Sequence, residues 1–144
     1  MSAAYKGDVS ASECWSALGD TPEAFLVDVR TAAEWTFVGI PELSALGKQP
    51  ILIEWQSYPT MAVDPAFPQR VAEAIAAAGG TQASPVYFLC RSGARSMASA
   101  AALTAAGFEN CFNVADGFEG PADADGHRGT RAGWKAAGLP WVQR

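Results

Sequence analysis

The stretch Pro85–Leu103, PVYFLCRSGARSMASAAAL, joins an apolar run to an alanine-rich run through a short polar loop. Its first part, Pro85–Leu89, indicates a β-strand covered on both faces, because apolar side chains follow one another without polar alternation. The alanine-rich part predicts a helix over Ala94–Ala106 that ends at Gly107. A strand that passes directly into a helix is the building unit of an α/β fold.

Three other short apolar runs are flanked by turn signals and also indicate buried strands: Ala24–Val29, Ile51–Trp55 and Cys111–Val114. Segments with helix signals lie between these runs. A regular alternation of strands and helices implies right-handed crossovers between parallel strands. We therefore expect an α/β fold in which a central, mostly parallel sheet is flanked by helices on both faces.

The helix signals are local and have clear physical reasons. Ser10 and Thr31 each stand three positions before a glutamate, and this capping box satisfies backbone donors in the first turn of a helix. An aspartate followed by proline is typical of a helix start, and a glycine pair is typical of an end. The remaining helices are predicted from Asp64-Pro65 to Gly79-Gly80 and from about Thr130 to Ala137.

Length and charge limit the organisation and the partners. A chain of 144 residues can bury one well-filled core, so residues 1–144 are expected to form a single domain. The net charge of −5 argues against a nucleic-acid partner, which requires cations to neutralise phosphates. No apolar run is long enough to cross a bilayer or to resemble a signal peptide, so we expect no membrane contact and a cytoplasmic location.

The cysteine and histidine content argues against disulfides and metals. The three cysteines, Cys14, Cys90 and Cys111, are odd in number and far apart, which is typical of reduced thiols. The chain has 1 His and no CxxC pair, so the sequence predicts no zinc site. No metal or organic cofactor is expected.

The expected strand ends bring several polar residues to one edge of the sheet. Ligands bind beyond the carboxyl ends of parallel strands. The residues at or just beyond these ends are Asp28, Arg30, Trp55, Gln56, Cys90 and Asp116.

The loop that follows Pro85–Leu89 has the composition of an anion cradle. Backbone N–H groups turn inward where a strand enters a helix, and the helix N-terminus adds a partial positive charge. Cys90 at the start of this loop, close to Arg91 and Arg95, is therefore predicted to be a nucleophilic thiolate. The arginines can orient an anionic substrate. The other loop residues expected to bind substrate are Ser92, Gly93, Ala94 and Ser96.

These motifs resemble the single-domain rhodanese, or thiosulfate sulfurtransferase, family. The resemblance covers about residues 10–142 and rests on CRSGARS at 90–96, on Asp28-Val29-Arg30, and on Trp134 followed by Gly138-Leu139-Pro140. It implies a three-layer rhodanese-like fold. It also implies that Cys90 takes the outer sulfur of thiosulfate, or of a similar small anionic donor, as a persulfide. The acceptor would be cyanide or a thiol on a small molecule or protein.

The resemblance also assigns supporting roles. Asp28 would lie near the loop as the partner of one of its arginines, and Arg30 would complete the first signature with Glu34 and Trp35. Trp55, in an aromatic segment that ends at Phe67, is expected to form a pocket wall.

Other interpretations remain open at this stage. Cysteine phosphatases and arsenate reductases also hold a thiolate in a ring of amides, but they place five residues between cysteine and arginine, whereas four separate Cys90 from Arg95. A non-catalytic binding or regulatory module is a third possibility, although such modules commonly lose the cysteine. Cys14 and Cys111 are expected to pack in the core rather than to relay sulfur.

Overall fold

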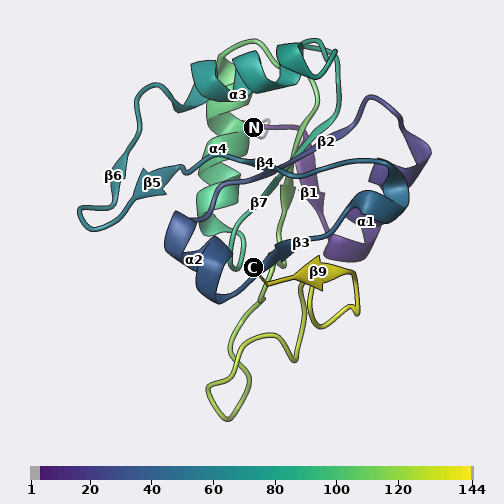
Figure 1. Cartoon of the computed structure of the whole chain (residues 1–144). Helices are drawn as coiled ribbons and strands as arrows, with labels where there is room; N and C mark the ends of the chain where they lie inside the picture. The colour runs from purple at the N-terminus through teal and green to yellow at the C-terminus, as the bar shows by residue number, and fades with distance from the viewer. Residues whose placement is uncertain (1–3, 144) are drawn as a thin grey trace.

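The computed structural model describes residues 4–143 and contains a five-stranded, wholly parallel sheet at its centre (Figure 1). Helices cover both faces of this sheet, so the predicted three-layer α/β architecture is confirmed. Each apolar run predicted to be a strand contributes to the sheet, and a further strand, β1, lies at one edge. The strands in spatial order are β1 (Gly7–Val9), β8 (Cys111–Val114), β7 (Val86–Leu89), β2 (Phe25–Asp28) and β4 (Ile51–Leu52).

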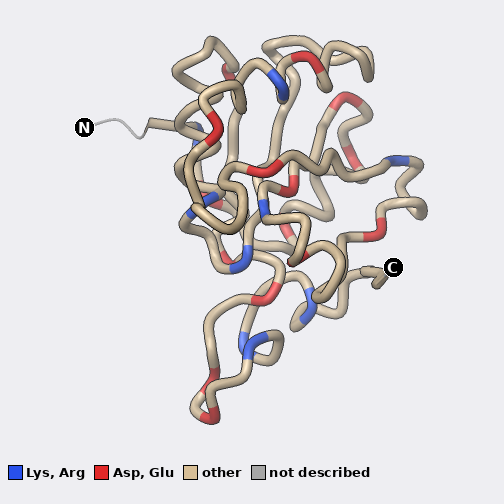
Figure 2. The backbone as a smooth tube through the Cα atoms, turned by 60° about the vertical axis from the view of Figure 1, so that its left-hand side comes forward, with Lys and Arg blue, Asp and Glu red and all other residues tan. Residues whose placement is uncertain are grey.

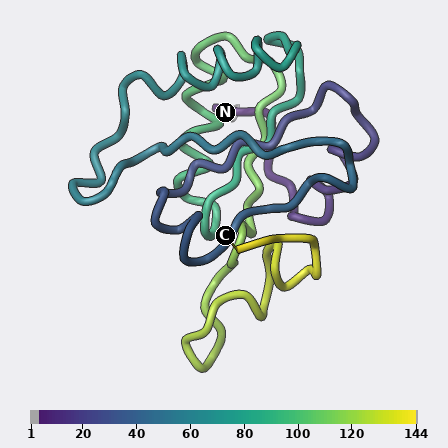
Figure 3. The backbone as a smooth tube through the Cα atoms, viewed as in Figure 1, coloured from purple at the N-terminus to yellow at the C-terminus, as the bar shows by residue number. Residues whose placement is uncertain are grey.

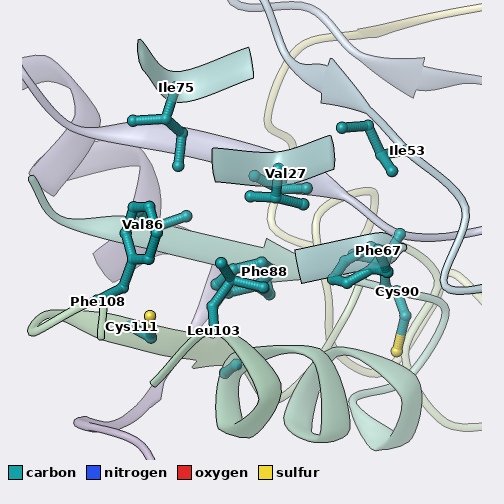
Figure 4. Packing of buried hydrophobic residues seen from close by; sticks show 13 residues of the cluster. Val27, Ile53, Phe67, Ile75, Val86, Phe88, Cys90, Leu103, Phe108 and Cys111 are labelled. Atoms are coloured by element: carbon teal, nitrogen blue, oxygen red, sulfur yellow. The ribbon is translucent and has the colours of Figure 1, made fainter. Parts of the chain in front are cut away.

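The two faces of the sheet are covered by different helices. Helices α3 (Phe67–Ala77) and α4 (Ala94–Ala105) pack on the face that receives Val86, Phe88 and Cys90. Helix α1 (Ala11–Asp20) packs on the opposite face, where Tyr87 and Leu89 lie. All four residues of β7 are buried, because its side chains alternate between two covered faces. Figure 4 shows the first of these clusters, with Cys90 at one end.

Both predicted capping boxes are present. At the start of α1, the Ser10 amide donates to Glu13 Oε1 at 2.8 Å and the Glu13 amide donates to Ser10 Oγ at 3.1 Å. At the start of α2 (Ala32–Phe37), Thr31 and Glu34 make the same reciprocal pair. These caps fix the starts of the two helices that follow β1 and β2.

Helix α3 begins later than predicted. Asp64 forms a turn before the helix, where its carboxylate accepts a hydrogen bond from the Ala66 amide at 2.9 Å, and the helical residues start at Phe67. Pro68 rather than Pro65 occupies the first helical turn. The end predicted near Gly79-Gly80 is close to the observed end at Ala77.

The helix predicted for Thr130–Ala137 is wrong. Gly133, inside this range, has a φ of 105°, which a right-handed helix does not allow, and Gly129 and Gly138 on either side of it also have positive φ, at 87° and 73°. The segment forms turns instead, anchored by the fully buried Trp134, whose indole nitrogen donates to the Pro140 carbonyl at 2.7 Å. Figure 3 shows the chain leaving the end of β8 in a long excursion before it returns.

Short strands outside the central sheet were not predicted. The returning chain forms β9 (Trp141–Val142), which pairs antiparallel with β3 (Ile40–Pro41). Strand β4 stops at Leu52, and Gln56 lies in a separate hairpin of β5 (Gln56–Ser57) and β6 (Ala62–Val63), which projects from the body of the fold (Figure 1). A short 3₁₀ helix covers Ser44–Leu46.

Charged residues are spread along the backbone. Figure 2 shows Lys and Arg interspersed with Asp and Glu along the backbone. Among residues 4–143, the structure contains no helix that is both long enough and apolar enough to span a bilayer.

Candidate active site

Cys90 lies where the carboxyl ends of two neighbouring strands meet. Asp28, the last residue of β2, is in register with Leu89, the last residue of β7, and the Val29 amide donates to the Leu89 carbonyl at 2.9 Å. Cys90 follows immediately and is 1% exposed. Figure 4 shows its sulfur directed toward the first turn of α4. The predicted convergence of the β2 and β7 ends is therefore present around this sulfur.

The sulfur of Cys90 lies close to one backbone amide and one serine hydroxyl. The Gly93 amide donates to Sγ at 3.1 Å, and Ser96 Oγ lies 3.2 Å from Sγ. The amides in the first turn of any helix have no intrahelical acceptor. Helix α4 begins at Ala94 without a side-chain cap, so no capping side chain accepts from these amides either. These amides and the helix dipole give the loop a partial positive charge. The arrangement favours an anion on or next to the sulfur.

Backbone hydrogen bonds hold the loop against the segment that follows β8. The Phe118 amide donates to the Cys90 carbonyl at 2.8 Å, and the amides of Glu119 and Gly120 donate to the Arg91 carbonyl at 3.1 and 3.0 Å. Gly93 adopts φ of 109°, and a Cβ on it would collide with the Ala115 carbonyl oxygen. The tight approach of these two segments therefore requires glycine at position 93.

Arg95 is held by Glu34 of α2. Its Nη1 and Nη2 donate to the two carboxylate oxygens of Glu34 at 2.6 and 2.9 Å, and each side chain is about one-fifth exposed, at 19% and 20%. Burial by itself would raise the pKa of Glu34, but hydrogen bonds and charge from Arg95, together with hydrogen bonds from Thr31, lower it to about 2. The charge of Arg95 is thus largely compensated within the protein.

Replacement of Glu34 by glutamine is expected to remove a pH-dependent part of the stability. The pKa of Glu34 falls from 4.5 to about 2 on folding, so the stabilisation is complete above about pH 4.5 and is lost as the pH falls toward 2. We expect Glu34→Gln to lower the unfolding free energy by about 1–2 kcal/mol near pH 7, after allowance for solvent screening. Urea unfolding between pH 2 and 7 measures this difference.

A matched control is Asp64→Asn, which breaks the exposed ion pair with Arg70 at 2.9 Å. We expect a smaller effect because solvent screens this pair. A loss of stability for Glu34→Gln that is the same at pH 2 as at pH 7 would contradict the role given to the Glu34 carboxylate.

Asp28 makes no hydrogen bond to a loop arginine among the described residues, so the expected pairing was wrong, although Asp28 lies close enough to interact electrostatically with Arg95. It binds Arg30 instead, which donates from Nε at 3.0 Å and from Nη2 at 2.6 Å, and both side chains are fully buried. Arg30 Nη2 also donates to the Gly39 carbonyl at 2.7 Å, and its guanidinium lies 4.2 Å from the ring centroid of Phe118. The contacts with the Asp28 carboxylate and with the face of the Phe118 ring stabilise the buried guanidinium of Arg30.

The remaining predicted residues lie around the same rim. Arg91, Ser92 and Ala94 are exposed, and Ser96 is buried beside the sulfur. Trp55 makes an edge-to-face contact with Phe67 at 5.0 Å between ring centroids, and Figure 4 shows Phe67 next to Cys90. Trp55 is therefore connected to the site by its contact with Phe67, which lies next to Cys90.

Asp116 lies just beyond the carboxyl end of β8, as expected. Its carboxylate accepts a hydrogen bond from the Ala11 amide at 2.8 Å, which ties it to the start of α1. Burial is the main cause that raises the pKa of Asp116 above its usual value.

The other two cysteines pack in the core. Cys111 is in register with Val86 at the start of β7, whereas Cys90 follows the end of that strand. Cys14 belongs to the cluster on the opposite face of the sheet. Burial raises the pKa of both thiols, which keeps them protonated. These positions agree with the packing role expected from the sequence.

Two residues near the sulfur were missed in the sequence. Ser96 Oγ donates to Asn113 Oδ1 at 2.6 Å, and Asn113 Nδ2 donates to Asp8 Oδ1 at 3.1 Å. The signal for Asn113 was its position, since it is a polar residue inside the apolar run Cys111–Val114. Asp8 gave no such signal, because the strand that carries it is 3 residues long.

Comparison with known proteins finds relatives that match nearly the whole chain. Residues 6–144 match the protein family described as the STR4 middle domain. An uncharacterized protein of Rickettsia conorii is 37% identical over 134 residues, which is 93% of this chain and 95% of the relative. The chloroplastic rhodanese-like domain-containing protein 4 of Arabidopsis thaliana is 26% identical over 137 residues, which is 95% of this chain but 26% of the relative.

Solved structures share the architecture. The crystal structure of Rv0390 from M. tuberculosis is 45% identical with a TM-score of 0.83, and the match covers 97% of this chain and 99% of that chain. The solution structure of a homodimeric polysulfide-sulfur transferase from Wolinella succinogenes is 21% identical with a TM-score of 0.58, over 95% of this chain and 78% of that chain. At 21% identity, this second likeness concerns the fold.

Proposed function

The chain belongs to the STR4 middle domain family, a rhodanese-like family, and from this premise we propose that it is a sulfurtransferase. In this proposal Cys90 accepts a sulfane sulfur from thiosulfate or a similar anionic donor and passes it to a thiol or cyanide. The observation that carries the proposal is the position of Cys90 Sγ, which lies at the uncapped start of α4 with the Gly93 amide at 3.1 Å. This position suits a covalent intermediate whose outer atom is an anion.

The reaction has two balanced steps. The Cys90 thiolate attacks the outer sulfur of thiosulfate, a new S–S bond forms, and sulfite leaves with the electron pair of the bond that breaks. An acceptor thiolate or cyanide then attacks the outer sulfur of the persulfide and releases the Cys90 thiolate. Neither step needs an external oxidant or reductant, because each transfers sulfur between two nucleophiles.

The loop provides suitable groups for each species. The first-turn amides of α4 would hold the terminal sulfur of the persulfide, with the exposed Arg91 and Ser92 as contacts for the anionic donor. Arg95 would act mainly as a positioning residue, since both of its η nitrogens already bind Glu34. The buried Asp28–Arg30 pair would support the floor of the site, and Trp55 would form part of its wall.

The same contacts weigh against a phosphatase or arsenate-reductase activity. Those enzymes need a free guanidinium to bind the oxyanion, and here Glu34 occupies the guanidinium of Arg95. The shared fold with a polysulfide-sulfur transferase supports a sulfur donor of this kind. A cytoplasmic location and a single domain over residues 1–144 remain our expectations.

The proposal is tested by the intact mass of the reduced protein before and after thiosulfate. We expect a gain of one sulfur atom that cyanide removes as thiocyanate. Polysulfide is the second donor, in case thiosulfate does not reach the loop. Hydrolysis of an aryl phosphate without any sulfur gain would instead favour the phosphatase, and neither reaction with either donor would favour a binding module.

A further inference from the structure

A chain of hydrogen bonds connects the buried sulfur of Cys90 to a carboxylate at the surface. Ser96 Oγ lies 3.2 Å from Sγ and 2.6 Å from Asn113 Oδ1, and Asn113 Nδ2 lies 3.1 Å from Asp8 Oδ1. Ser96 is 0% exposed and Asn113 is 1% exposed, whereas Asp8 is exposed. The residues come from α4, β8 and β1, and the last two are held together because Asp8 and Asn113 are directly opposite each other in the sheet.

The carboxylate fixes the direction of every proton in this chain. An ionised aspartate only accepts hydrogen bonds, so the NH₂ group of Asn113 must face Asp8 and its carbonyl oxygen must face Ser96. That oxygen has no proton to offer. The short contact of 2.6 Å between Ser96 and Asn113 therefore uses the single hydroxyl proton of Ser96.

The direction of the Ser96 proton also affects Cys90. With its proton committed to Asn113, Ser96 presents only lone pairs to the sulfur. The contact of 3.2 Å between Oγ and Sγ is then favourable when Cys90 is a thiol that donates its own proton, and unfavourable when the sulfur carries the charge. A persulfide escapes this conflict, because its Sγ is bonded to a second sulfur and has neither a proton nor a formal charge.

We propose that Asp8 and Asn113 are positioning residues that turn the Ser96 hydroxyl away from Cys90, so that negative charge is disfavoured on Sγ and left to the outer sulfur of the persulfide. The proposal rests on the sulfurtransferase function. It assigns opposite effects to two sides of the site: the Gly93 amide and the start of α4 stabilise an anion, while the Asp8 chain withholds the Ser96 hydrogen bond from a charge on Sγ.

Other titratable groups lie at both ends of the chain and are left unchanged in the test. Tyr5 Oη donates to Asp8 Oδ1 at 2.8 Å. Near Cys90 lie Arg91 in the loop, Arg95 with its partner Glu34, and the Asp28–Arg30 pair at the end of β2.

The test is the pH dependence of Cys90 alkylation by iodoacetamide, followed at this cysteine by peptide mass spectrometry. In Asp8→Asn, residue 8 can donate as well as accept, so the Asn113 amide can turn and donate to Ser96, which frees the Ser96 proton for the sulfur. We expect the pH midpoint of alkylation to fall by about one unit. Asp8→Ala, which removes the carboxylate without adding a donor, should shift the midpoint in the same direction by less.

Two controls separate this chain from a simple field effect. Asp20→Asn, at the exposed end of α1, removes the same charge and should leave the midpoint unchanged. In a Ser96→Ala background, Asp8→Asn should have no effect, because the hydroxyl that transmits it is absent. An equal shift with and without Ser96, or no shift in either Asp8 variant while thermal unfolding shows intact folds, would overturn the proposal. Alkylation needs no sulfur donor, so this result is independent of whether thiosulfate loads the protein.

Discussion

Cys90→Ser is expected to abolish the gain of sulfur completely, because the nucleophile of the proposed reaction is lost. The buried site should remain intact. Serine is slightly smaller than cysteine, and its hydroxyl can still accept the Gly93 amide and contact Ser96. We therefore expect the unfolding free energy to change by about 1 kcal/mol or less, while the intact mass after thiosulfate stays that of the unloaded chain.

The matched controls are the two other cysteines. Cys14→Ala and Cys111→Ala remove thiols that pack on opposite faces of the sheet, and each should still gain one sulfur atom. Both will lose stability, because each leaves space in the core. A sulfur gain that persists in Cys90→Ser and disappears in Cys111→Ala would move the reactive thiol and contradict the assignment.

Gly93→Ala is expected to have the largest effect on the loop without removing any chemical group. The added methyl group would meet the Ala115 carbonyl oxygen, in a backbone conformation with φ of 109° that alanine rarely adopts. We expect a loss of about 3–5 kcal/mol, from backbone strain and overpacking together. The Gly93 amide would also leave Sγ, so sulfur loading should fall more than tenfold. Urea unfolding and intact mass measure the two effects.

Gly107→Ala separates strain from collision. Its φ of 105° is almost the same, but an added Cβ would meet only the flexible side chain of Gln82, at 3.1 Å. We expect this variant to lose about 1 kcal/mol and to load sulfur normally. Equal losses of stability in the two variants would mean that the contact with Ala115 has no role.

The parts predicted well from the sequence are those determined by neighbouring residues. The passage from β7 to α4, the buried character of β7 and both capping boxes depend on residues within a few positions of one another. The same local reasoning failed for Thr130–Ala137, where helix-compatible residues are interrupted by Gly133, which adopts a positive φ. The buried side chain of Trp134 determines that segment, and its contacts are made through the fold rather than through sequence neighbours.

The partners within the site could not be predicted because they are distant in the sequence. Arg95 and Glu34 are 61 positions apart, and Asn113 and Asp8 are 105 positions apart. In the sequence Glu34 was recognised as a capping residue and as part of the first signature, but not as the partner of Arg95; its carboxylate both caps α2 and binds Arg95. Asp28 was assigned to the wrong arginine, because the pairing depends on how Arg30 folds back over Phe118.

The lengths of the central and edge strands also bear on self-association. The three central strands have 4 residues each, whereas the edge strands β1 and β4 have 3 and 2. An edge this short offers few free backbone groups to a second chain, and Asp8 adds a charge to one of them. The sheet is therefore protected from edge-to-edge aggregation by the same short strand that brings Asp8 to Asn113.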